Sequence, residues 1–169
     1  DTCRRQRQMC IRDRYIIILY MFNANTFGFI NGVVELLGLS VGLYVAKASR
    51  VVFISAILAV IIADPLLDAY AIFTAEKEKY SIEVASKTAI QAFLSNFVVK
   101  FTILMMYVII PNLKIAIYTV CTLGFISVFL YGLWKNMPLK ENLINMAIIV
   151  VLIFITWSAE HLVQRFFKK

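Results

Sequence analysis

The stretch Ala63-Asp64-Pro65-Leu66-Leu67-Asp68-Ala69-Tyr70 places two carboxylates inside an otherwise apolar run. Residues four positions apart lie on one face of a helix, so Asp64 and Asp68 point the same way. A charge inside a bilayer costs about 2.5–3.5 kcal/mol even on insertion scales, and a close pair of like charges costs more. Pro65 also takes away one backbone hydrogen bond, which can free a carbonyl group beside the pair. The pattern therefore favours a cation or proton site over a purely structural polar cluster.

The composition indicates an integral membrane protein. Hydrophobic residues make up 62% of the chain and charged residues 16%, whereas soluble domains have about 45–50% and about 25%. The mean hydropathy is +0.82. At about 20 residues per membrane-spanning helix, the chain has room for about four to six helices and little else. We expect an all-α, multi-pass protein whose surroundings are the lipid bilayer.

Polar breaks divide the apolar sequence into five segments. The first segment begins near Tyr15 and is longer than one span, so it is either tilted or preceded by an interfacial turn near Asn23-Ala24-Asn25. We expect a five-helix transmembrane bundle that forms a single domain over residues 15–169. The breaks lie at residues 47–50, 76–87, 111–114 and 135–140. The expected helices cover about residues 26–46, 51–75, 86–110, 113–134 and 141–166.

The first 14 residues differ in character from the rest of the chain. They hold five of the 17 basic residues. The run from Gln6 to Asp13 resembles the conceptual translation of sequencing-adapter read-through, so we expect residues 1–14 to be non-native. The alternative is a polybasic arm that faces the lipid. Nucleic acid is not an expected partner, because no other part of the chain shows a basic face with interleaved aromatic residues.

The first expected helix carries a polar stripe. Asn31 and Glu35 lie one turn apart, and Glu35 is the only charge in this helix. They either face the aspartates or form a structural hydrogen bond. Two Gly-x-x-x-Gly pairs, Gly28 with Gly32 and Gly38 with Gly42, predict close helix packing.

The remaining polar positions in the apolar sequence are few. Asn96 and Lys100 share a face of the third expected helix. Lys100 either extends toward the membrane interface or neutralises an aspartate of the second helix. Glu76 and Glu78 follow the second helix in a charged cluster, which is usually a solvated surface; the alternative is an entrance below the aspartates that attracts cations. No disulfide framework, zinc spacing or nucleotide-binding motif is present in the sequence.

The sequence resembles the vacuolar iron transporter family over about Phe27 to Phe166. The segment from Phe27 to Leu43 is similar to the family's first-helix pattern of an Asp-Gly followed by an apolar run and a Gly. Asp64 and Asp68, followed by the acidic run from Glu76 to Glu78, resemble a prokaryotic subset of the family. Two departures matter. Asn31 replaces the family's first-helix aspartate, for which Glu35 can compensate, and the family's cytosolic metal-binding extension is absent or shortened to residues 76–87.

The resemblance implies a divalent-cation transporter for Fe²⁺ or Mn²⁺ that works by metal/proton antiport, as a homodimer in a prokaryotic cell membrane. Carboxylate oxygens suit these cations, and two carboxylates this close take up a proton when the cation leaves. The transported ion and protons are then its partners, with no resident cofactor. The candidate metal ligands are Asp64, Asp68, Glu35, Asn31, Glu76 and Glu78.

Two other classes of protein fit the sequence less well. A non-transporting scaffold or assembly subunit would use the same polar residues only to lock helices together. An intramembrane aspartyl hydrolase needs two aspartates converging from different helices, whereas Asp64 and Asp68 lie on adjacent turns of one helix. We therefore do not expect an enzyme.

Deleting residues 1–14 is expected to leave expression and transport unchanged, because the segment is predicted to be foreign to the fold. Expression yield, size-exclusion profile in detergent and transport in proteoliposomes, compared between the full-length and truncated proteins, test this. A folding defect in the truncated protein would show that the segment is native.

Overall fold

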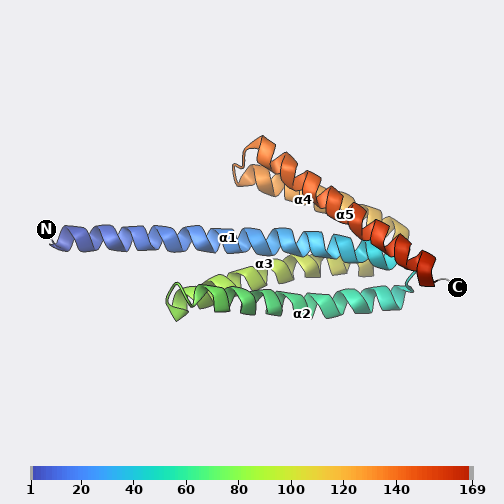
Figure 1. Ribbon diagram of the computed structural model, residues 1–169, viewed down its shortest axis with the longest axis horizontal. Coiled ribbons are helices and arrows are strands. Elements are labelled where there is room, and N and C mark those ends of the chain that lie inside the picture. Colours follow the sequence, from blue (N-terminus) through green and yellow to red (C-terminus); the bar gives the residue numbers. More distant parts are fainter. Residues whose placement is uncertain (1, 168–169) are drawn as a thin grey trace.

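The fold is described from a computed structural model, which gives the backbone of residues 2–167 and the side chains of residues 24–159, 161–163 and 165–166. Within these residues the chain forms five α-helices and no strand, which confirms the expected all-α bundle (Figure 1). The helices are α1 Thr2–Val45, α2 Arg50–Glu76, α3 Ile82–Ile109, α4 Leu113–Trp134 and α5 Leu139–Phe167.

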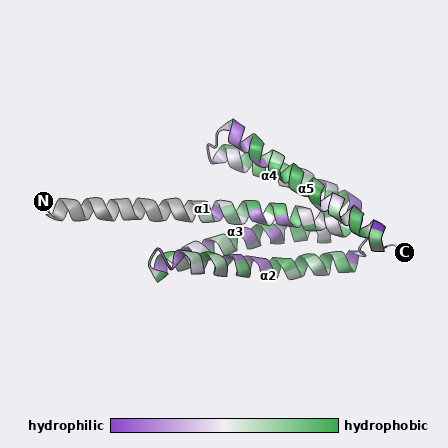
Figure 2. Ribbon diagram, in the orientation of Figure 1, coloured by the Kyte–Doolittle hydropathy of each residue, from purple (hydrophilic) through white to green (hydrophobic). Residues whose placement is uncertain are grey.

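All five helices are long and apolar enough to cross a membrane, and the membrane segment of α1 is Ala24–Val45. Hydrophobic residues predominate along the coloured parts of the helices, and hydrophilic residues lie at the α2–α3 and α4–α5 turns and at a few positions within the helices (Figure 2). The chain is thus a multi-pass membrane protein.

Local capping sets the helix boundaries. Asn112 accepts hydrogen bonds from the backbone N–H groups of residues 114 and 115, so α4 covers the expected range. The third helix begins four residues earlier than expected, because Ser81 caps it and Glu83 stabilises its N-terminus. Glu83 and Lys87, expected in the charged connection, instead form an exposed ion pair of 2.7 Å along the start of α3.

Of the two alternatives for the long first segment, the interfacial turn at residues 23–25 is absent, since α1 runs through them without a break. Asparagine is a poor helix former, but the cost is a fraction of a kcal/mol and packing overrides it. Ala24 is buried, and the carbonyl oxygen of Asn25 accepts a hydrogen bond of 2.8 Å from Ser95 of α3. The backbone of residues 2–14 is part of α1, but their side chains lie outside the described residues, so the expectation that residues 1–14 pack against nothing is untested.

The two central helices are α1 and α3. Helix α2 packs against α3, and the α4–α5 hairpin leans away on the other side of α1 (Figure 1).

The first glycine pair, Gly28 and Gly32, allows the close approach of α1 and α3. A Cβ at Gly28 would collide with the carbonyl oxygen of Ala92, and one at Gly32 would lie 3.0 Å from Asn96 Oδ1. The second pair, Gly38 and Gly42, lines a groove beside α5 instead of a tight contact.

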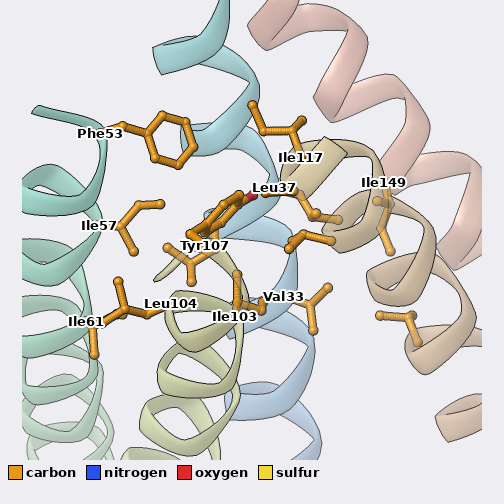
Figure 3. Packing of buried hydrophobic residues seen from close by; sticks show 14 residues of the cluster. Val33, Leu37, Phe53, Ile57, Ile61, Ile103, Leu104, Tyr107, Ile117 and Ile149 are labelled. Atoms are coloured by element: carbon orange, nitrogen blue, oxygen red, sulfur yellow. The ribbon is translucent and has the colours of Figure 1, made fainter. Parts of the chain in front are cut away.

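An apolar core fills one half of the bundle. Tyr107 of α3 lies between the core residues of α2 and α1, and its ring meets Phe53 edge-on at 4.9 Å (Figure 3). Ile61 and Ile103 are the core residues nearest in sequence to Asp64 and Lys100. The polar side chains of the next helical turns therefore lie directly beside a well-packed apolar layer.

The glycine contacts predict a pair of contrasting variants. Gly28→Ala is expected to destabilise the protein by about 1–3 kcal/mol, because the added carbon overlaps a backbone oxygen that cannot rotate away. Gly38→Ala is the matched control, since its Cβ would meet only Thr156 Oγ1, at 3.8 Å. Thermal unfolding in detergent measures both, and equal stability for the two variants would contradict the packing of α1 on α3.

Candidate cation site

Six polar side chains from three helices meet in the middle of the bundle. Each helix supplies two of them, four residues apart, so both point to one face. Helices α1 and α3 run in the same direction and α2 runs in the opposite one (Figure 1), and side-chain hydrogen bonds between them show that the three pairs lie at the same level. We call this set the polar layer; it consists of Asn31 and Glu35 of α1, Asp64 and Asp68 of α2, and Asn96 and Lys100 of α3.

Lys100 lies at the centre of the polar layer. Its ammonium group contacts Glu35 Oε2 at 2.6 Å and also pairs with Asp64 Oδ2. The Lys100 side chain is fully buried, whereas those of Glu35 and Asp64 are 32% and 25% exposed. Of the two sequence-based alternatives, neutralisation of an aspartate is therefore correct and extension to the interface is wrong.

Asp68 has a different environment. Its Oδ2 accepts hydrogen bonds of 2.7 Å from Asn31 Nδ2 and 2.9 Å from Asn96 Nδ2. Within the described part of the chain, no cationic group lies within ion-pair distance of Asp68. Neutral amides thus orient this carboxylate without compensating its charge.

The charges of the polar layer do not balance. Three carboxylates face one ammonium group, so two negative charges lack an opposite partner when all four groups are ionised. Each uncompensated charge costs several kcal/mol in a membrane interior. The layer is therefore favourable only if protons or a cation supply the missing positive charge.

Asn96 leaves one acceptor unused. Its side chain is fully buried, and its Oδ1 has no hydrogen-bond donor among the described residues. Buried polar atoms are nearly always hydrogen-bonded. The polar layer thus offers an amide oxygen in addition to its carboxylates.

The structure brings together only some of the predicted metal ligands. Asn31, Glu35, Asp64 and Asp68 meet in the polar layer. Glu76 ends α2 and Glu78 lies in the turn after it. Glu76 is about 12 Å farther along α2 than Asp68, by the rise of a helix.

No contact in the described residues links Glu76 or Glu78 to the polar layer, so their grouping with its ligands is not supported. The sequence-based ligand set also omitted Asn96 and Lys100. Their spacing of four residues inside an apolar helix was the available signal.

Metal-binding geometry is not preformed. Among the described residues, no group of three or more His, Cys, Asp or Glu side chains is placed to hold a metal ion. The Lys100 ammonium group contacts both Glu35 and Asp64, so it already uses the carboxylate oxygens that a metal ion would need.

A groove between α1 and α5 leads to the polar layer. It has a volume of about 480 Å³, and its lining includes Glu35, Gly38 and Thr156. A neighbouring hollow of about 310 Å³ reaches Asn31 and shares Val34 with the groove. The α1 side of the polar layer is therefore accessible from the α5 side of the bundle.

Comparisons with protein-family models, with curated proteins and with solved structures found no match to this chain. The resemblance to vacuolar iron transporters stays a hypothesis.

Asn96→Ala is expected to destabilise the protein by about 1–2 kcal/mol, because it removes the donor shared by Asp68 and Asp64. Thr102→Ala is a control on the same helix, where only an exposed hydroxyl bonded to its own helix is lost. Chemical or thermal unfolding in detergent compares the two. Equal stability of both variants would show that the Asn96 hydrogen bonds do not tie α2 to α3.

Proposed function

We propose that the protein is a carrier that exchanges a divalent cation, Fe²⁺ or Mn²⁺, for protons across a prokaryotic cell membrane. One observation carries the proposal: the polar layer lies in the membrane-spanning segments and has two negative charges without partners. An intramembrane cluster of this kind is by default part of an ion or proton pathway.

The charge of the layer matches the proposed exchange. One divalent cation or two protons would each neutralise the two unpaired negative charges. The site is then uncharged with either occupant, and it avoids the cost of a net charge in the bilayer. A monovalent cation alone would leave one charge uncompensated.

The available ligands also fit the proposed ions. The layer offers carboxylate and amide oxygens and contains no thiolate or imidazole. Oxygen ligands can hold Mn²⁺ and Fe²⁺, whereas thiolates favour Zn²⁺ and Cu⁺. The groove beside Glu35 would admit the ion from the α5 side, and by the resemblance to the transporter family we include a homodimer in the proposal.

A second candidate function is a non-transporting assembly subunit. The hydrogen bonds of the polar layer tie α1, α2 and α3 together, as a structural lock would. The lack of a preformed metal site in the described residues also favours this alternative. The two functions predict different effects when one charge of the layer is removed.

Asp68→Asn separates the two functions. The amide keeps the shape of the side chain and removes a charge that has no cationic partner, so stability should be unchanged or improved. Transport should fall at least about tenfold, since the layer could no longer neutralise a divalent cation. Mn²⁺-driven proton flux in proteoliposomes, measured beside thermal stability in detergent, gives both quantities.

The matched control is Glu83→Gln, the same type of change at an exposed ion pair. It should leave the flux unaltered and lower the stability by no more than about 1 kcal/mol, because an exposed ion pair and one charge at a helix N-terminus are each worth little. Wild-type flux from Asp68→Asn would remove Asp68 from the transport site, and a loss of stability without any flux in the wild type would support the assembly subunit.

A further inference from the structure

We infer that the Lys100 ammonium is a tethered cation that competes with the transported ion for Glu35 and Asp64, and thereby limits how tightly the site holds that ion. The inference rests on the proposed function and assigns Lys100 a role within it. Lys100 acts here as a positioning and specificity-determining residue, not as a ligand.

The position of Lys100 excludes an ordinary surface role. It lies 18 residues after the start of α3 at Ile82 and nine before its end at Ile109. By the rise of a helix, it is about 27 Å and about 14 Å from the two ends. The charged group therefore cannot reach the membrane surface and depends on the carboxylates of α1 and α2.

The ammonium group of these ion pairs is more deeply buried than the two carboxylates. Lys100 approaches Glu35 and Asp64 from the buried side, and both carboxylates keep an exposed fraction. Glu35 also lines the α1–α5 groove, which Lys100 does not. An ion arriving through the groove would meet Glu35 without first passing the ammonium group.

Displacement requires only a side-chain movement. A divalent cation between Glu35 and Asp64 would repel the ammonium group, and at these separations inside a protein the repulsion is strong. Lysine has a flexible four-carbon stem, so its head can shift away from Glu35 and Asp64 while it stays within the polar layer and α3 stays in place. When the ion leaves, the ammonium group returns and compensates the two carboxylates again.

Removing Lys100 changes the charge of the polar layer from two unpaired negative charges to three. Lys100→Met should therefore bind Mn²⁺ at least about tenfold more tightly than the wild type and release it more slowly. Added Mn²⁺ should also raise its unfolding temperature more than it raises that of the wild type. Lys87→Met is the matched control, because it makes the same change on the same helix at an exposed ion pair.

The double variant Lys100→Met/Glu35→Gln restores two unpaired charges and removes both members of the ion pair. Its affinity for Mn²⁺ should return toward the wild-type value. Titration calorimetry with Mn²⁺ and unfolding with and without Mn²⁺ are measured for all four proteins in the same detergent.

The outcomes separate the inference from the function on which it rests. If the wild type binds Mn²⁺ and Lys100→Met binds it no more tightly, the inference is wrong and the proposed function stands. If the wild type neither binds nor transports Mn²⁺, the proposed function fails as well. If Lys100→Met and the double variant both fail to fold even with Mn²⁺ present, Lys100 is a structural residue and the inference is overturned.

Discussion

The contact of one buried ammonium group with two carboxylates is the interaction on which the rest of the structure depends. Lys100 joins α3 to Glu35 of α1 and Asp64 of α2, and it does so in the middle of the membrane-spanning helices. Buried ion pairs are not by themselves strongly stabilising, because desolvation offsets most of their attraction. An arrangement that also leaves two charges unpaired is better explained by a function that supplies protons or cations.

The packing around the polar layer makes this interaction possible. Gly28 and Gly32 let the backbone of α1 approach α3, and the apolar core next to the layer holds α2 against both. Interfaces of small residues are the usual way for membrane helices to pack closely. Gly38 and Gly42 instead leave the groove beside α5 open, so one glycine pair serves packing and the other serves access.

Much of the fold could be predicted because it depends on local patterns. Hydrophobic length and polar breaks gave five helices, and the spacing of four residues placed Asp64 with Asp68 and Asn31 with Glu35 on common faces. The partners of Lys100 could not be predicted in the same way, because they depend on which face of α3 packs against α1 and α2, and local sequence does not determine this packing. Glu76 was grouped with the aspartates because it is close in sequence, but two helical turns separate it from the polar layer.

The charge balance of the polar layer is the central claim, and proton release on metal binding tests it most directly. Mn²⁺ is added to the purified protein in a weakly buffered detergent solution near neutral pH, and the bound metal and the released protons are both counted. The account predicts close to two protons released for each Mn²⁺ bound, and fewer for Asp68→Asn. Binding of Mn²⁺ without proton release would contradict it.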